Sequence, residues 1–218
     1  MAARSDSSVQ VFARAPVAGS VKTRLIPLLG AQGAAALHQR LVEQSLAVAC
    51  DSGPDRVEVW CTPDTIDPFF ESCRKRFGVS LHRQSAGDLG ARMLDAIEDG
   101  LGRALHVLLI GSDCPSLTAT DLRTSARALR DGRDAVFCPA EDGGYMLVGM
   151  SQAMPALFEA MTWGTDTVME ETRQRLHNLG WRWHELPPHW DVDRPEDYQR
   201  LLREGWLTAD GSHGEQRG

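Results

Sequence analysis

The chain has 218 residues and a formal net charge of -7 at pH 7, and 42% of its residues are hydrophobic and 24% charged. This length and composition are typical of one large globular domain and exclude a largely disordered chain. The negative charge excludes a nucleic-acid binder that acts through a basic surface and favours a protein that handles small molecules.

Short apolar, β-branched runs alternate with helical patterns along the chain. The first half predicts strands at 9–13, 57–61, 79–83 and 106–110, with helices at 31–50, 66–76 and 88–101 between them. A helix follows at 118–130, with Thr118 as its N-cap and Asp121 completing a capping box. The remainder predicts strands at 135–138 and 145–148, helices at 154–161 and 167–179, a strand at 181–186, and a last helix from Pro195.

Alternation of strands and helices predicts a mostly parallel sheet that is covered by helices on both faces. We expect one domain over residues 9–205, with flexible tails at 1–8 and 206–218. Ligands of open parallel sheets bind outside the carboxyl ends of the strands. The segments that follow the strands are therefore the places to look for chemistry.

Location and cysteine chemistry follow from simple patterns. The five cysteines include no Cys-x-x-Cys pair, so we expect reduced, mostly buried thiols rather than a zinc site. The first eight residues have no apolar core of a signal peptide, and no apolar run reaches the roughly 20 residues that cross a bilayer. A cytoplasmic protein without membrane partners is expected.

The segment Ala15–Leu25 follows the first predicted strand. Gly19 would let the backbone approach a ligand closely, and Lys22 and Arg24 add fixed positive charge. Amide donors and cations in one loop suit a di- or triphosphate, although the loop has neither the P-loop nor the dinucleotide-binding glycine pattern. A solvated basic loop is the alternative.

Asp113 follows the most apolar predicted strand, where no ladder partner needs its side chain. Hard cations such as Mg²⁺ or Mn²⁺ take carboxylate oxygens, so Asp113 is a candidate metal ligand, with a turn or N-cap role as the alternative. Asp193 or Asp191 could complete the site, although this segment is also typical of a helix start. We predict that Asp113 and Asp193 hold the metal.

Two other segments carry weaker signals. Asp142 either faces a substrate or belongs to a tight turn on the paired glycines that follow it, and the turn is favoured. Asp88 is a candidate N-cap, and Arg92 one turn later could reach a phosphate. No histidine has metal-ligand spacing, and we assign none of them a role.

Together these segments resemble a bacterial family of glycosyltransferase-A-type (GT-A) enzymes in the nucleotide-diphospho-sugar transferase superfamily. Some members of that family are named for arsenosugar biosynthesis or for association with radical-SAM proteins. The matching segments occur in order between residue 9 and about residue 202. They are Ala13–Pro16 with Gly19–Leu25, Gly87–Gly90 with Arg92–Met93, Gly111–Pro115, Pro139–Tyr145, Trp163–Thr165 and Asp191–Asp197.

The resemblance implies a three-layer α/β/α, Rossmann-like, GT-A nucleotide-binding fold with a divalent metal, Mg²⁺ or Mn²⁺, at Asp113. It makes Asp113 and Asp142 the catalytic candidates and strengthens the roles of Lys22, Arg24 and Asp193. It also adds the other matching positions to the nucleotide- or substrate-binding set: Ala13, Pro16, Gly19, Asp88, Arg92, Gly143, Gly144, Tyr145, Trp163 and Thr165. One departure is that sugar transferases of this fold usually carry Asp-x-Asp, where this chain has Gly111-Ser112-Asp113.

Three activities fit this resemblance. We favour a glycosyltransferase that passes a sugar from a nucleotide-sugar to a small acceptor, with Asp142 facing the sugar or acceptor. The residues expected to form the sugar pocket are Asp142, Gly143, Tyr145, Trp163 and Thr165. The cationic loop, and a likeness to guanylyltransferases, indicate instead a nucleotidyltransferase that joins a nucleoside triphosphate to a phosphorylated small molecule and releases pyrophosphate. The third is an inactive nucleotide-binding module. The joint presence of five charged residues counts against it: Lys22, Arg24, Asp113, Asp142 and Asp193.

Overall fold

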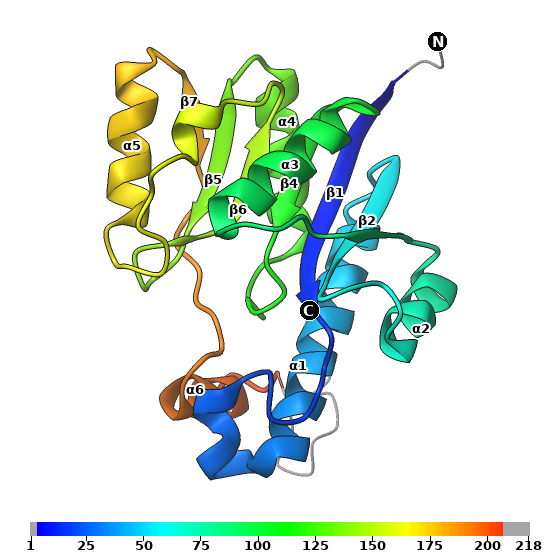
Figure 1. Cartoon of the computed structure of the whole chain (residues 1–218). Helices are drawn as coiled ribbons and strands as arrows, with labels where there is room; N and C mark the ends of the chain where they lie inside the picture. Colours follow the sequence, from blue (N-terminus) through cyan, green and yellow to red (C-terminus); the bar gives the residue numbers. More distant parts are fainter. Residues whose placement is uncertain (1–3, 207–218) are drawn as a thin grey trace.

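The computed structural model describes residues 4–206. In these residues a seven-stranded sheet is covered by helices on both faces (Figure 1). The strands are β1 (Ser5–Arg14), β2 (Arg56–Thr62), β3 (Ser80–Arg83), β4 (Ala104–Ile110), β5 (Ala135–Pro139), β6 (Tyr145–Met150) and β7 (Trp183–Glu185). The helices are α1 (Ile26–Asp51), α2 (Pro68–Phe77), α3 (Leu89–Leu101), α4 (Ala119–Arg130), α5 (Val168–Asn178) and α6 (Pro195–Arg203), with short 3₁₀ turns η1 (Thr23–Leu25) and η2 (Pro155–Leu157).

The strand order is β3-β2-β1-β4-β6-β5-β7. Pairing is parallel between β1 and β2, β1 and β4, β2 and β3, and β5 and β7, whereas β6 runs antiparallel to β4 and β5. The sheet is thus mostly parallel and the fold is Rossmann-like, as predicted. The carboxyl ends of β1 to β5 lie at one edge of the sheet, and β6 begins there.

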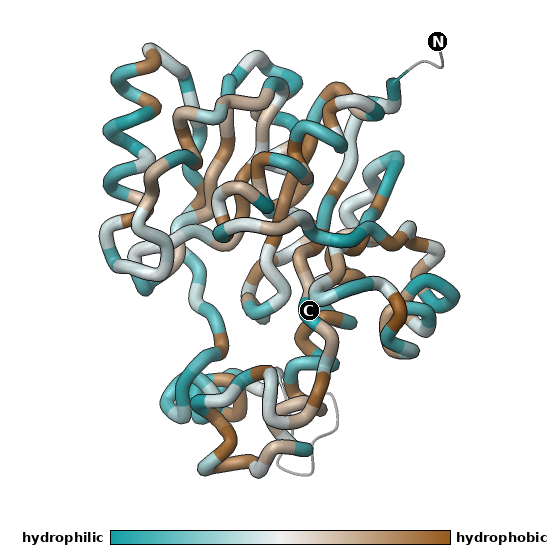
Figure 2. Tube along the Cα trace, in the orientation of Figure 1, coloured by the Kyte–Doolittle hydropathy of each residue, from teal (hydrophilic) through white to brown (hydrophobic). Residues whose placement is uncertain are grey.

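Strand alternation divides the core into two layers. Val9 and Val11 pack on the layer made by α1, α2 and α4, whereas Phe12 packs on the layer made by α3 and α5. In Figure 2 the central strands are coloured mainly as hydrophobic, whereas α5 is coloured mainly as hydrophilic. Each fully buried aliphatic side chain contributes about 1.5–3 kcal/mol, so the two layers together fix the sheet that carries the site.

A third, smaller cluster lies beyond the carboxyl edge of the sheet. It is formed by η1, the start of α1, α6 and the chain before α6, with Leu25, Trp190 and Val192 at its centre. In Figure 1 this part lies below the sheet. None of the described helices is long and apolar enough to cross a membrane.

Several helix starts are as predicted. The Thr118 side chain and the Asp121 carboxylate form the capping box of α4, and α6 begins at Pro195. The Asp88 carboxylate accepts a hydrogen bond of 2.8 Å from the Ala91 backbone N–H and caps α3. These local hydrogen bonds satisfy backbone donors that the first turn of a helix leaves free.

Other predicted boundaries are wrong. Residues 5–8, expected in a flexible tail, belong to β1, because Ser5 to Ser8 pair with β4. The helix α1 begins at Ile26, five residues early, with a kink at Gly30, whose φ is 68°. The helix expected at 154–161 is only the turn η2, because Leu157 and Phe158 are both buried and Ala160 takes a left-handed φ of 53°. The predicted tail residues 1–3 and 207–218 lie outside the described residues.

Candidate functional site

Loops that are distant in sequence meet at the carboxyl edge of the sheet. The Val192 backbone N–H donates to the Asp113 carbonyl at 2.9 Å, which joins the segment before α6 to the loop after β4. The Glu141 N–H donates to the His189 carbonyl at 2.9 Å and ties the β5–β6 turn to the same segment. These bonds gather the acids that the sequence places in separate segments.

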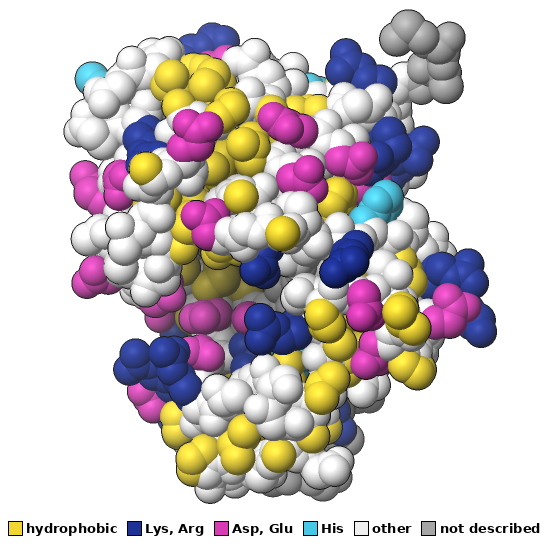
Figure 3. Space-filling model, in the orientation of Figure 1, with side chains coloured by type: hydrophobic (Ala, Val, Ile, Leu, Met, Phe, Trp, Pro, Cys, Tyr) yellow, Lys and Arg dark blue, Asp and Glu magenta, His cyan; other side chains and the backbone are white. Residues whose placement is uncertain are grey.

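A cavity of about 430 Å³ lies among these loops. Figure 3 shows acidic and basic side chains around a hollow between the sheet and the cluster that contains α6. The charged residues that line the cavity are Arg24, Glu141, Asp142, Asp166, Asp191, Asp193, Arg194 and Asp197. Six acids and two arginines thus surround a volume that suits a small-molecule substrate.

Asp113 is held by two basic side chains. The Lys22 Nζ lies 2.8 Å from its Oδ1, and the His38 Nδ1 lies 3.7 Å from the same oxygen. Burial opposes the ionisation of Asp113, but Lys22 and His38 outweigh this cost and hold the pKa of the carboxyl well below its usual range. The Asp113 side chain is nevertheless 43% exposed, although its Oδ1 is buried. Part of the ionised carboxylate is therefore accessible to a ligand.

Lys22 is more constrained than a solvated loop residue. Its side chain is only 4% exposed, and its backbone takes the left-handed conformation with φ 46° ahead of η1. A non-glycine residue in this region carries strain, which the ion pair with Asp113 and the surrounding packing must offset. Lys22 is thus held against Asp113, and its predicted contact with a substrate phosphate stays a prediction.

His38 contacts Asp113, and the sequence alone did not predict this contact. It lies on the buried face of α1, and its Nε2 donates to the Arg14 carbonyl at 2.9 Å, at the end of β1. Its other ring nitrogen faces Asp113. The only sequence signal is a histidine within an apolar helix face, which by itself does not indicate a site.

Asp191 and Asp193 have different surroundings. Burial, and then the neighbouring carboxylates of Asp142 and Asp113, raise the pKa of Asp191 to about 6, although Lys22 lowers it. Asp193 instead forms an ion pair with Arg24, and its backbone N–H donates to Asp197 at 3.0 Å. The structure therefore groups Asp191, rather than Asp193, with Asp113.

The β5–β6 connection is a turn, as predicted, and it packs against the loop before α5. The Gly144 N–H donates to the Asp142 carboxylate at 3.0 Å. Gly143 has φ 91°, and a Cβ there would lie 2.1 Å from the Asp166 carbonyl oxygen. This close contact places Asp166, which the sequence analysis missed, on the same cavity as Asp142. The paired glycines were the signal for such an approach.

The two aromatic residues expected at a sugar pocket pack elsewhere. The rings of Tyr145 and Trp163 meet edge to face at 6.2 Å, and Tyr145 also packs edge to face on Phe137 at 5.1 Å. Burial raises the pKa of the Tyr145 hydroxyl. Neither ring lines the cavity, whereas Thr165 does.

Five further predicted residues lie outside the lining of the cavity. The Ala13 side chain is buried in the core, while Pro16 is half-buried and Gly19 is exposed. Asp88 caps α3, and the Arg92 Nε donates to the Gly87 carbonyl at 2.9 Å. None of these five residues lines the 430 Å³ cavity.

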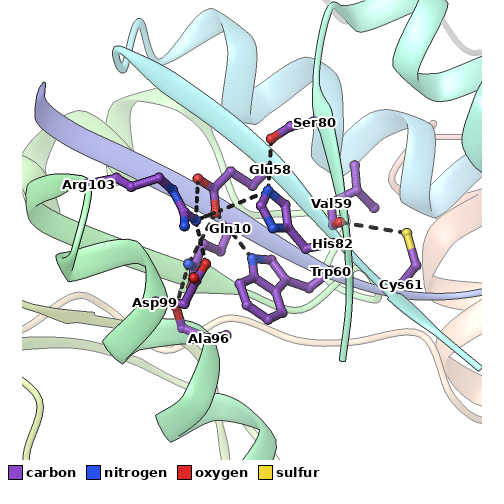
Figure 4. Close-up of polar contacts among 10 residues, drawn as sticks. All are labelled: Gln10, Glu58, Val59, Trp60, Cys61, Ser80, His82, Ala96, Asp99 and Arg103. Carbon is purple, nitrogen blue, oxygen red and sulfur yellow. Dashed lines mark hydrogen bonds and ion pairs between the residues drawn. The ribbon is translucent and has the colours of Figure 1, made fainter. Parts of the chain in front are cut away.

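A second group of potential metal ligands lies between β2, β3 and α3 (Figure 4). In it, Glu58, His82 and Asp99 bring their ligand atoms within 4.8 Å of one another. The Arg103 guanidinium already binds both acids, at 3.0 Å from Glu58 and 2.5 Å from Asp99. Gln10 and Trp60 also donate to the Glu58 carboxylate, so its oxygens are already bound by internal donors, and the group forms an internal polar network.

Comparison with known proteins places the chain in a family. Residues 45–165, more than half of the chain, match the family of uncharacterized proteins conserved in bacteria (DUF2064), and the chain belongs to this family. None of the curated proteins matches the chain.

Solved structures share the fold. A proposed nucleotide-diphospho-sugar transferase from Desulfovibrio desulfuricans G20 is 27% identical, with a TM-score of 0.84 over 94% of this chain and 90% of that one. A cytidylyltransferase from Leptospira borgpetersenii is 18% identical, with a TM-score of 0.59 over 96% and 91%. A Mycobacterium tuberculosis H37Rv protein, Rv0371c, in complex with manganese is 18% identical, with a TM-score of 0.56 over 91% and 98%. The last two are similar in fold alone.

Proposed function

We propose that this member of the DUF2064 family is a metal-dependent transferase that takes a nucleotide-diphospho-sugar as donor and passes the sugar to a small acceptor. The observation that carries this proposal is the acid-lined cavity at the carboxyl edge of the sheet, between Asp142 and Asp191 and beside Asp113. The 27% identical protein from Desulfovibrio desulfuricans G20 supports it.

The acids of the site fit a divalent cation. Asp113 is ionised and partly exposed, and the pKa of Asp191 is raised first by burial and then by the neighbouring carboxylates of Asp142 and Asp113. Carboxylate oxygens are the ligands that Mg²⁺ and Mn²⁺ prefer. We assign the metal to Asp113 and Asp191 in place of Asp193, which Arg24 already binds. When bound, the cation would neutralise charge on the diphosphate of the donor.

The other residues take roles that follow from their positions. Lys22 holds Asp113 in place, and Arg24, whose side chain is 64% exposed, lies at the cavity where it can bind a phosphate. Asp142, Thr165 and Asp166 line the same cavity and offer acceptors and a hydroxyl to the hydroxyl groups of a sugar or acceptor.

Nucleotidyl transfer is the second candidate. The loop after β1 brings Lys22 and Arg24 to the site, where cations would stabilise departing pyrophosphate, and several proteins of the same fold are nucleotidyltransferases. The charge of the cavity favours sugar transfer, because six acids against two arginines would repel a phosphorylated acceptor more than a neutral polyol or an amine.

The test incubates the chain and Mn²⁺ with labelled nucleotide-sugars, and separately with nucleoside triphosphates and phosphorylated acceptors. We expect release of nucleoside diphosphate in the first reaction. Asp113→Asn should lower the rate about 100-fold or more, the usual effect of removing one key electrostatic group. Asp95→Asn, which removes an exposed acid of α3, is the matched control. Release of pyrophosphate in the second reaction alone would refute sugar transfer.

A further inference from the structure

A second cavity, of about 540 Å³, lies on the α1–α4 side of the sheet. Its walls are α4 and the residues that follow α1, Ser52, Gly53 and Pro54. Its floor includes Val9 of β1 and Leu108 of β4, both of which are almost fully buried. We call this cavity the arginine groove, because Arg123, Arg127 and Arg130 of α4 line it.

The charge of the arginine groove is unusual for a chain with a net charge of -7. Its lining contains the three arginines and four hydroxyl side chains but no acid. The hydroxyl residues are Ser7, Ser52, Thr120 and Thr124. Residues spaced three and four apart on a helix share one face, so the three guanidiniums are presented together.

Two of the three arginines have hydrogen-bond or ion-pair partners, and among residues 4–206 only Arg130 pairs with a carboxylate. Arg123 donates to the Asp51 carbonyl at 3.0 Å and to the Thr120 hydroxyl at 2.9 Å, and both of these partners are uncharged. Arg130 pairs with Asp6 at 2.7 Å, with both side chains about half exposed, and pairs of this kind stabilise little. Arg127 has no carboxylate within ion-pair distance among residues 4–206. Asp55, the other acid near Ser7, accepts from the backbone N–H groups of Asp6 and Ser7.

We propose that the arginine groove binds the phosphate group of a small molecule, at a site separate from the acid-lined cavity. The guanidinium groups of Arg123, Arg127 and Arg130 line one volume and match the several acceptor oxygens of a phosphate. Val9, Leu108 and Leu122 close the groove on the side of the core but are each only 1% exposed, so recognition rests on the charged and polar groups. The two cavities share no lining residue.

The test titrates the full chain, without metal, with inorganic phosphate and with phenyl phosphate, and follows backbone amide signals by NMR. We expect saturable changes at Gly53 and Thr124 with both probes. The double variant Arg123→Gln/Arg127→Gln should weaken binding about tenfold or more, whereas Arg203→Gln, which removes one exposed positive charge from α6, should not.

Arg24→Ala separates this inference from the proposed function, since Arg24 lines only the acid-lined cavity. Binding at the arginine groove should survive this change. Signal changes confined to the loops around Asp113, or equal affinity in the double variant and the unmodified chain, would overturn the proposed phosphate site.

Discussion

The position of Asp191 lowers the stability of the folded state at neutral pH, where its carboxyl is ionised. Burial and the carboxylates of Asp142 and Asp113 raise its pKa from 3.8 to about 6. The folded state therefore binds the proton more tightly than the unfolded state does. By linkage, the contribution of Asp191 to stability is most favourable below about pH 4 and is lost as the pH rises through 6.

Asp191→Asn should accordingly raise the free energy of unfolding at pH 8 and have little effect at pH 4. We expect a gain of about 1–2 kcal/mol, less than the full value of the pKa shift because the side chain is partly exposed. Urea unfolding at the two pH values measures it, and Asp95→Asn is the control. An equal gain at both pH values, or none at pH 8, would contradict the assignment.

Arginine and lysine positions are also informative at this scale. Lys22 and Arg24 are two residues apart, yet Lys22 is buried on Asp113 and Arg24 is exposed on Asp193. The sequence predicts both as phosphate-binding cations, because it gives their charges and not their partners. The side chain of Arg24 is exposed whereas that of Lys22 is buried, so Arg24 is the better candidate for direct contact with a phosphate.

At the scale of elements, the turn between β5 and β6 and the loop before α5 form one unit. The Met169 N–H donates to the Gly143 carbonyl at 2.8 Å, and the Gly143 Cα approaches the backbone of Asp166 too closely for any side chain. This contact keeps Asp142 and Asp166 on the same cavity. Geometry of this kind explains why the first glycine of the pair is required.

Gly143→Ala should lower the free energy of unfolding by about 2–4 kcal/mol, through the positive φ and through the clash with Asp166. Gly78→Ala is the matched control, because Gly78 also has a positive φ but has open space at its Cβ position, and it should cost only about 1 kcal/mol. Chemical unfolding of both variants gives the comparison. Equal losses would show that the close contact contributes nothing.

Most elements could be predicted from the sequence because their signals are local. The apolar runs of β1 and β4, the capping box at Thr118 and the proline at Pro195 each act within a few residues. The failures have tertiary causes. Residues 154–161 do not continue as a helix, since Leu157 and Phe158 are taken into the core below α3.

The site could be predicted only in part. The sequence places Asp113, Asp142 and Asp191 in loops at the sheet edge, because the fold rule for parallel sheets is general. It does not distinguish Asp191 from Asp193, which differ only in which side chains the folded loops bring near them. His38 and Asp166 were missed for the same reason, since their partners are distant in sequence.

At the scale of the whole molecule, charge is divided between two cavities. The acid-lined cavity carries six of the acids of the chain, whereas the arginine groove carries three arginines and no acid. The first suits a cation together with an anionic donor, and the second suits an anion alone. A ligand of the first cavity should therefore stabilise the fold most when metal and donor are present together.

Joint binding of metal and donor in the acid-lined cavity leads to a prediction for thermal unfolding. A ligand at one hundred times its Kd adds about 2.7 kcal/mol to the free energy of unfolding, which for a domain of this size corresponds to a Tm increase of roughly 5–11 °C. We expect this increase with Mn²⁺ and a nucleotide-diphospho-sugar together, and a smaller one with either alone. Asp113→Asn should abolish the joint effect, and Asp95→Asn should preserve it, because Asp95 lines neither cavity. A nucleoside triphosphate that stabilises the chain with Mn²⁺, when no nucleotide-sugar does so, would instead support nucleotidyl transfer.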